Sequence, residues 1–343
     1  MAKGKNIFLF GGLLLLLLVC FFADLFLGSV KIPIDNLIGI LLNRQAEHPE
    51  WEIIVREFRI PRAVTAVFAG LSLSLAGLQM QTLFRNPLAG PYVLGISSGA
   101  SLGVALLIMG AYILFPGRDM HLQTWGVITA AWLGSGMIML LLLLVSFRIK
   151  DIMTILILGI LFGAITIAFV SILQYFTHEA LLKTFIVWTL GSLGNVTRDQ
   201  LPVFSGSLAV GVFLSVISIK MLNAMLLGEN YAKSMGINVM SGRILLFIGT
   251  SILAGTVTAF CGPIGFIGIA IPHIARLIWK TADHRILIPA VMLAGAIILL
   301  ISDMISQLPG SDKVLPINSV TALIGIPVVV WIVVRNQRFA NLS

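Results

Sequence analysis

Charged residues are scarce in this sequence. Asp, Glu, Lys and Arg make up 10% of the 343 residues, whereas 58% are hydrophobic, and the mean hydropathy is +1.05. A soluble domain carries about 25% charged residues, because its surface must be covered by groups that water solvates. This chain has too few for that, so its composition excludes an ordinary soluble protein and predicts that lipid covers much of its surface.

Motifs for several kinds of chemistry are also missing. No GxxxxGK(S/T) phosphate-binding loop and no HExxH motif occurs, which leaves an ATPase or a zinc-dependent membrane protease without a motif. The two cysteines, Cys20 and Cys261, lie inside apolar runs without a CxxC partner. They predict neither a disulfide nor a metal site, and no cofactor is expected.

The basic residues give a net charge of +8, but they stand singly between apolar runs. Nucleic-acid binding would need a basic stripe or patch, so no nucleic-acid partner is predicted. Scattered Lys and Arg are typical of topology signals, and more of them fall on the side that carries the N-terminus. The positive-inside rule therefore predicts that both termini are cytoplasmic.

Long apolar runs are abundant, and about 20 such residues cross a ~30 Å hydrocarbon core as a helix. Lys3 and Lys5 precede the first run in the manner of a signal peptide, but no cleavage site follows, so an uncleaved helix is predicted. The run 181–190 is too short to cross and is expected at an interface or re-entering. The sequence predicts a single all-α domain, 1–343, with these ten spans: 7–27, 62–83, 92–114, 125–146, 152–174, 202–222, 243–261, 264–280 (interrupted by Pro272), 286–305 and 318–334.

Ionisable groups at membrane depth indicate function by default. Only Asp24 and Asp303 qualify here, and they are far apart in the sequence. Two separated carboxylates make a poor proton relay, which argues against a proton-driven carrier. No filter-like motif supports a channel either.

Two polar segments between spans have unusual content. Residues 28–61 form a mixed-charge segment that is predicted to be an outer loop. Residues 223–242 form an inner loop with helix-forming residues between Gly228 and Gly236. A short cytoplasmic helix there would offer a compact docking surface to a soluble partner.

Four stretches of this sequence resemble the FecCD/BtuC-type permeases, the membrane subunits of binding-protein-dependent importers for ferric siderophores, haem and cobalamin. They are residues 59–103, 222–236, 262–285 and 315–333, in the order expected for that family. The resemblance implies a type II ABC importer permease fold with ten transmembrane helices and a coupling helix. It also implies two cytoplasmic ATPase subunits, an outer substrate-binding protein and a second permease subunit, predicted to be identical.

The resemblance carries functional roles to particular positions. Arg59 and Arg62 match the outer Arg-x-Pro-Arg that meets acidic residues of the binding protein, and a planar guanidinium suits carboxylates. Plain interfacial arginines are the alternative. The cytoplasmic gate falls at Asp151, Ile152, Met153 and Thr154. The residues implied for coupling to the ATPase are Leu226, Leu227, Gly228, Glu229, Ala232 and Gly236.

The chain also departs from the family pattern on its outer side. Family members often carry Arg four residues after the aspartate that corresponds to Asp303, and this chain has Gln307. They often read Glu-Leu-Pro-x-Gly before the last helix, where this chain reads Val-Leu-Pro-Ile-Asn from Val314. Lys313 is hypothesised to supply the missing positive charge.

Taken together, these observations predict a permease subunit that performs no covalent chemistry and moves an iron complex, a ferric siderophore or haem, by alternating access. A cobalamin importer of the same family is the first alternative. A secondary transporter that works alone is the second, and a membrane enzyme or structural protein is the third.

Overall fold

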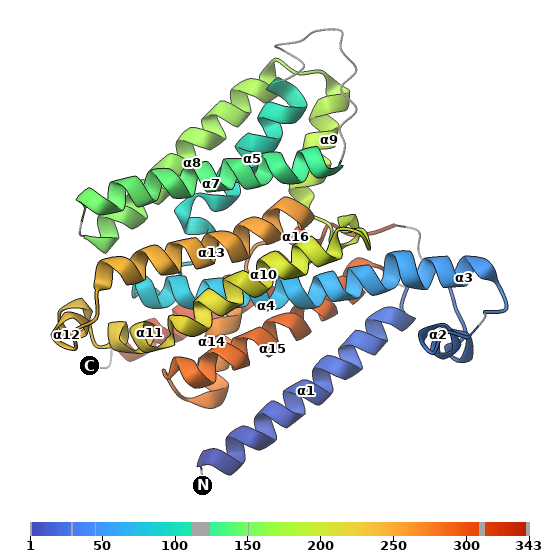
Figure 1. Cartoon of the computed structure of the whole chain (residues 1–343), viewed down its shortest axis with the longest axis horizontal. Helices are drawn as coiled ribbons and strands as arrows, with labels where there is room; N and C mark the ends of the chain where they lie inside the picture. Colours follow the sequence, from blue (N-terminus) through green and yellow to red (C-terminus); the bar gives the residue numbers. More distant parts are fainter. Residues whose placement is uncertain are drawn as a thin grey trace.

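The computed structural model describes residues 2–28, 30–44, 46–110, 124–149, 151–308 and 313–340. Within these ranges every regular element is helical, which confirms the predicted all-α class (Figure 1). The α-helices are α1 (Ala2–Phe26), α2 (Ile34–Leu41), α3 (Pro49–Ile53), α4 (Ile60–Leu83), α5 (Ile96–Ala105), α7 (Thr124–Arg148), α8 (Ile152–Tyr175), α9 (Glu179–Leu190), α10 (Leu201–Ile217), α11 (Ile219–Leu226), α12 (Glu229–Ser234), α13 (Val239–Cys261), α14 (Ile267–Trp279), α15 (His284–Ser306) and α16 (Ile317–Ala340).

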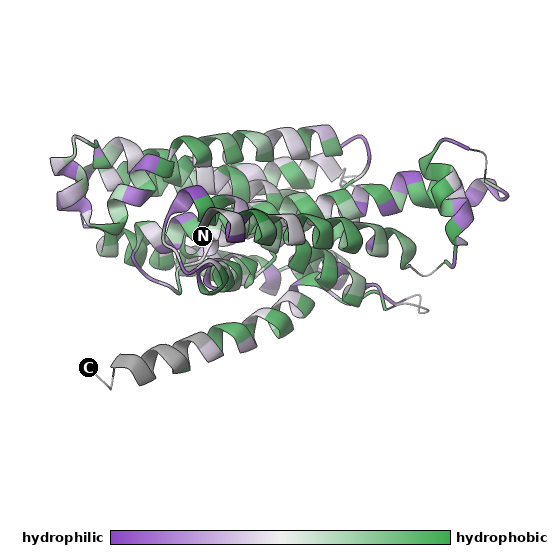
Figure 2. Cartoon of the chain, turned by 90° about the horizontal axis from the view of Figure 1, so that it is seen from below, coloured by the Kyte–Doolittle hydropathy of each residue, from purple (hydrophilic) through white to green (hydrophobic). Residues whose placement is uncertain are grey.

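The membrane-spanning elements agree with the apolar runs of the sequence. Six helices are long and apolar enough to cross a bilayer, and α10 with α11 forms a further span bent by 50°. Three shorter apolar helices, Ile96–Gly110, Ile267–Trp279 and Ile317–Trp331, lie where the other three spans are predicted. The hydrophobic residues gather along the middle of these helices and the hydrophilic ones at their ends (Figure 2).

Helix α4 runs through the centre of the molecule and packs against α10, α13, α14 and α15 (Figure 1). Most of α4 is buried, whereas hardly any of α1 is. Small residues allow this central position, because they let helix backbones approach closely. A methyl group at Gly70 would overlap the backbone of Gly295 in α15, and one at Gly77 would overlap Gly268 in α14.

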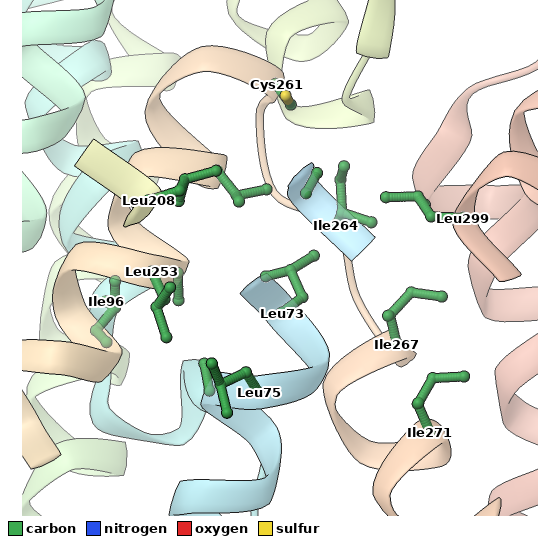
Figure 3. Packing of buried hydrophobic residues seen from close by; sticks show 14 of the residues in the cluster. Leu73, Leu75, Ile96, Leu208, Leu253, Cys261, Ile264, Ile267, Ile271 and Leu299 are labelled. Atoms are coloured by element: carbon green, nitrogen blue, oxygen red, sulfur yellow. The ribbon is translucent and has the colours of Figure 1, made fainter. Parts of the chain in front are cut away.

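Apolar side chains from these helices meet around α4 (Figure 3). Leu73 and Leu75 of α4 are fully buried there, as are Leu208 of α10 and Leu253 of α13. Lipid tails are as apolar as these side chains, so close packing and not exclusion from water holds the helices together.

The predicted outer loop 28–61 is corrected by the structure. It contains α2 and α3, and a continuous helix runs from Pro49 to Leu83. A π-helical turn, Ile54–Arg59, joins α3 to α4 just before Pro61. Proline has no N–H to bond within a helix, and a locally altered hydrogen-bond register accommodates it without ending the helix.

Two other predicted segments differ in detail. The span predicted at 92–114 begins with a 3₁₀ turn, Pro91–Leu94, and continues through α5 into a π-helical turn, Leu106–Gly110. Residues 111–114 of that prediction lie outside the described residues. The run 181–190 forms α9, whose Phe185 and Trp188 are buried.

Candidate functional sites at the two ends of the helices

One end of the bundle holds an ion pair between α4 and α15. The Arg62 side chain donates to both carboxylate oxygens of Asp303, with Nε at 2.8 Å from Oδ2 and Nη2 at 2.7 Å from Oδ1. Asp303 is fully buried, while the Arg62 side chain is 20% exposed. The bidentate geometry is the strong form of this interaction, and it fixes the N-terminal end of α4 against the C-terminal end of α15.

Gln307 connects this pair to α1. Its Nε2 donates to Asp24 Oδ1 at 3.1 Å and to Asp303 Oδ2 at 3.0 Å. Asp24, like Asp303, is buried. Asp24 and Asp303 are far apart in the sequence, but their carboxylates meet at one site in the structure. Helix α1 packs along α15 and brings the C-terminal ends of both helices together.

Arg59 is the second member of the predicted docking pair, and the structure places it in a buried position. Its side chain is 8% exposed. Its guanidinium donates to the carbonyl oxygens of Leu25 at 2.7 Å and Phe26 at 3.3 Å, and also to that of Val30. These carbonyls lie at and just beyond the end of α1, where a helix has no N–H of its own to satisfy them. Arg59 thus caps α1 inside the protein.

A cavity of about 340 Å³ opens beside these residues. We call Asp24, Arg59, Arg62, Asp303 and Gln307 the Asp303 cluster; all but the deeply buried Asp303 line the cavity. The cluster contains two carboxylates and two guanidinium groups, so its formal charges balance. An arginine in place of Gln307 would give it a net positive charge, which is the electrostatic consequence of the departure from the family pattern.

Lys313 and Val314 lie in the segment before α16 and are exposed. The neighbouring Leu315 holds this segment to the end of α15: its N–H donates to Ser306 O at 2.8 Å, and Ser306 Oγ donates to Leu315 O at 2.7 Å. Lys313 does not line the cavity of the Asp303 cluster. Its predicted compensation for Gln307 would therefore act at the rim and not inside the cluster.

The opposite end of the bundle carries the short helix α12, which confirms the helix predicted between Gly228 and Gly236. Gly228 has φ 114° and Gly236 has φ 78°, backbone conformations that favour glycine at the two turns. Leu227, just before α12, is 66% exposed, whereas Ala232 of α12 is fully buried against the bundle. The helix thus has a buried contact with the bundle and an exposed apolar edge.

Two polar contacts tie the segment around α12 to the bundle. Glu229 forms an ion pair with Arg243 of α13. Arg85, just after α4, donates to Met225 O at 3.3 Å. Helix α12 is consequently attached to α13, and the preceding helix α11 is attached to the end of α4, so a movement of this segment would act on both.

A hydrogen-bond network links α11, α15 and α4 at the same end. Asn223 Nδ2 donates to Asp283 Oδ1 at 2.7 Å, and Asn223 Oδ1 accepts from the His284 N–H at 2.8 Å. The His284 ring lies 2.7 Å from Asn223 Oδ1 on one side and 2.9 Å from Thr82 Oγ1 on the other. The hydrogen bond from the Arg285 N–H lowers the pKa of the Asp283 carboxyl. The sequence did not predict this network, because its members are scattered along the chain.

The predicted gate segment, Asp151 to Thr154, forms the beginning of α8. Asp151 is the N-cap: its Oδ2 accepts from Thr154 N at 2.8 Å and from Thr154 Oγ1 at 2.6 Å. These hydrogen bonds, the one from the Thr154 hydroxyl first, lower the pKa of the Asp151 carboxyl. Ile152 and Met153 begin the helix, and Met153 is exposed. The gating role stays a prediction.

Apolar helices around a buried central helix, with a charged cavity at one end and a short helix at the other, define a polytopic membrane transport protein. The chain belongs to the FecCD transport family, whose model matches residues 16–335. Its relatives are transport components of ABC systems and not catalysts, and it is an inner-membrane protein. The family implies ATPase and substrate-binding partners and a permease dimer.

Two curated relatives show how closely the chain resembles characterised permeases. It is 34% identical over 329 residues to the hemin transport system permease protein HmuU of Yersinia pestis, covering 95% of this chain and 96% of that one. It is 36% identical over 327 residues to the vitamin B12 import system permease protein BtuC of Klebsiella pneumoniae, covering 95% and 93%.

A solved structure shares the fold. An inward-facing conformation of a metal-chelate type ABC transporter superposes with a TM-score of 0.83 at 28% identity, covering 95% of this chain and 99% of the other. The match over nearly the full length of both chains confirms the ABC importer permease fold that the resemblance implied.

Proposed function

We propose that this chain is the permease subunit of an ABC importer that moves an iron complex, haem or a ferric siderophore, across the inner membrane by alternating access. The full-length likeness to a hemin permease and to a metal-chelate type transporter carries this proposal. Cobalamin is the second candidate, since vitamin B12 permeases are as similar to this chain. Haem and cobalamin are both large metal chelates with an equatorial macrocycle, so one wide path between two permeases suits either.

The ATPase docks on the α12 end in this proposal, which makes that end and both termini cytoplasmic. The exposed apolar edge of α12 supports this, because exposed leucines at a protein end mark a surface made for a partner. The chain has no phosphate-binding loop of its own, so the two ATPase subunits are separate chains. Helix α1 begins and α16 ends toward the α12 end (Figure 1), so the termini share one side with α12.

The ATP-driven movement reaches the membrane helices through the contacts of α12. The Glu229–Arg243 ion pair passes it to α13, and the Asn223–His284–Thr82 network passes it to α15 and α4. Helix α4 is the central helix, so a displacement of its end acts on every helix around it. The gate at Asp151 to Thr154 opens on this same side, and its capped helix start would move with α8 as a unit.

The substrate-binding protein docks on the end that carries the Asp303 cluster. Arg62 is the guanidinium of this cluster that is partly exposed, so it meets an acidic partner in preference to the buried Arg59. Lys313 adds a rim charge, where it steers the encounter. The second permease copy completes the path between two identical subunits.

Transport by the reconstituted complex tests the proposal. The permease, its ATPase and its binding protein are placed in proteoliposomes, and uptake of haem, a ferric siderophore and cobalamin is compared. We expect ATP-dependent uptake of an iron complex that stops when a catalytic residue of the ATPase is mutated. Uptake that continues with the inactive ATPase and follows a proton gradient would contradict the permease assignment. Uptake of cobalamin alone would change the proposed substrate from an iron complex to cobalamin, and the chain would still be assigned as an importer permease.

A further inference from the structure

A cavity of about 410 Å³ lies at the α12 end, beside the Glu229–Arg243 ion pair. It is enclosed by the C-terminal end of α7, by α12 and by the N-terminal end of α13. The lining residues that matter to its chemistry are Ser146, Phe147, Glu229, Lys233, Met240 and Arg243. The cavity therefore sits where membrane-spanning helices reach the polar boundary of the bilayer.

The charges around this cavity favour an anion. Lys233 and Arg243 supply two cations, and Glu229, paired with Arg243, supplies one carboxylate. The N-terminal end of the 23-residue helix α13 also faces the cavity through Met240. A helix N-terminus carries partial positive charge and N–H groups that attract phosphate and other anions. The cavity is thus net positive from two independent sources.

One buried hydroxyl that lines the same cavity has no hydrogen-bond partner among the described residues. Ser146 is 1% exposed and lines the cavity, yet its Oγ has no hydrogen-bond partner among the described residues. Ser72 and Ser74 of α4 are also buried without a partner among the described residues, but they do not line this cavity. Other buried serines are bonded: Ser215 Oγ donates to Gly211 O and Ser218 Oγ donates to Leu214 O, both at 2.7 Å. Buried polar groups are rarely left without a partner, so Ser146 indicates that the cavity is filled in the working protein.

The surface beside the cavity identifies the kind of anion. Phe147, which lines the mouth, is 61% exposed, and Leu144 and Leu140 of α7 continue the same exposed apolar face toward the middle of the membrane. A soluble anion has no apolar groups to pack against such a face, whereas the acyl chains of a lipid can lie along it. Basic pockets between transmembrane helices at the inner boundary of the membrane bind anionic lipid headgroups.

We propose that this cavity binds the phosphate headgroup of an anionic phospholipid, with the acyl chains along Leu140, Leu144 and Phe147. Its placement in the inner leaflet rests on the proposed function, which makes the α12 end cytoplasmic; the binding itself does not. The headgroup would contact Lys233 of α12, the start of α13 and Ser146 of α7 at once. The bound lipid therefore braces the coupling helix against two membrane helices.

Lipid binding to the purified full-length permease tests this proposal, with dioleoyl phosphatidylglycerol and dioleoyl phosphatidylcholine as the probes in native mass spectrometry. We expect tighter binding of phosphatidylglycerol, weakened by added salt. Lys233→Gln should lower its affinity about fivefold, as the loss of one near-surface cation does. Ser146→Leu should fill the cavity and remove the preference for the anionic lipid. Ser146→Ala, which removes the hydroxyl alone and folds in any case, should weaken it.

Arg148→Gln is the matched control, because Arg148 is an exposed cation at the same boundary that does not line the cavity. Equal binding of the two lipids, or equal effects of Arg148→Gln and Lys233→Gln, would overturn the proposal. Displacement of phosphatidylglycerol by equimolar inorganic phosphate would reassign the cavity to a soluble anion. Unchanged lipid binding in the Lys233 and Ser146 variants with weaker ATPase association would assign it to the ATPase.

Uptake by the reconstituted complex separates a failed lipid site from a failed permease assignment. A permease without this lipid site still takes up its substrate when the ATPase is active, and only the lipid preference is missing. A chain that is not an importer permease shows no ATP-dependent uptake in any lipid, whatever it binds.

Discussion

The two ends of the helix bundle use charge in opposite ways. At the Asp303 cluster the charged groups bond to one another and to buried carbonyls, so little of them remains exposed. At the α12 end the ion pair is internal as well, but an apolar edge with Leu227, Tyr231 and Met235 stands exposed beside it. The first end is built as a closed charged junction, and the second as an open apolar contact surface.

This difference shows that a cluster of charged residues is not by itself a docking surface. Arg59 matches a docking motif in the sequence, yet its three carbonyl partners make it a cap for α1. Buried ion pairs are costly to break because the remaining partner stays buried without compensation. The Asp303 cluster therefore contributes to the fold first, and to recognition through its exposed edge.

Removing Arg62 should have the largest effect on stability. Arg62→Ala leaves Asp303 buried without its cation, and breaking a buried pair of this kind costs about 3–5 kcal/mol. We expect poor expression and a clearly lower unfolding temperature in detergent. Arg198→Ala is the control, because Arg198 and Glu57 form an exposed pair, which contributes about 0–1 kcal/mol. Similar effects of the two variants would show that the Asp303 cluster is not a structural junction.

Replacing Gly228 should damage the α12 end while sparing the Asp303 cluster. An alanine at φ 114° is strained by about 1–3 kcal/mol, and its methyl group would also crowd the Arg85 guanidinium. We expect Gly228→Ala to lose most ATP-dependent uptake while the protein remains folded. Gly206→Ala is the matched control, since nothing lies within 4 Å of that position. Full uptake by Gly228→Ala would contradict the coupling role of α12.

Asn223→Ala tests the network that connects α11 with α15 and α4. The change leaves the His284 N–H and the Asp283 carboxylate without a side-chain partner, which costs about 1–3 kcal/mol. We expect ATP hydrolysis by the complex to continue while uptake per ATP falls. Ser241→Ala at the start of α13 leaves the network intact and should keep the normal ratio. An unchanged ratio in Asn223→Ala would limit this network to stability.

Lys313→Ala tests the end of the bundle that carries the Asp303 cluster. As an exposed rim charge, Lys313 should change the encounter with the binding protein more than the stability of the permease. We expect binding to weaken by up to about fivefold, in line with the ~0.2–1 kcal/mol of exposed ion pairs, and a weaker dependence of affinity on salt. Surface plasmon resonance at two salt concentrations measures both. Unchanged affinity and salt dependence would remove Lys313 from the docking surface.

The smallest effect concerns pH and the Asp151 cap. Hydrogen bonds from Thr154 lower the pKa of Asp151 in the folded protein, so its contribution to stability is present above the unfolded pKa of about 3.9 and is lost as pH falls through the lower folded value. Asp151→Asn keeps a capping oxygen without the charge. The difference in unfolding temperature between the two proteins should shrink on acidification, and a pH-independent difference would contradict the assignment.

Much of the fold was predictable from the sequence, because span length is a local property. Each of the ten predicted apolar runs coincides with an apolar helix or helix pair, and Gly228 and Gly236 predicted a short helix between them. The end of the predicted loop 28–61 was wrong, since Pro61 normally indicates a helix start. A π-helical turn before Pro61 lets the helix begin at Pro49 instead.

The candidate sites were predictable only in part. The α12 segment is contiguous in the sequence, so its motif could be read directly. The Asp303 cluster joins residues from α1, α4 and α15, and the Asn223 network joins α4, α11 and α15. Contacts between distant segments depend on which helices pack together, and no local pattern specifies that.

The sequence alone predicted that lipid surrounds the protein, where its spans lie and which family it belongs to. Hydrophobic runs and contiguous motifs are local features, so they can be recognised without knowledge of packing. Only the tertiary structure decided that Asp24 and Asp303 share one site and that Arg59 faces carbonyls inside the protein. It alone also left Ser146 without a partner beside two cations. Each of these depends on which side chains face each other across a helix interface. That arrangement follows from how the helices pack, and small residues allow the close packing.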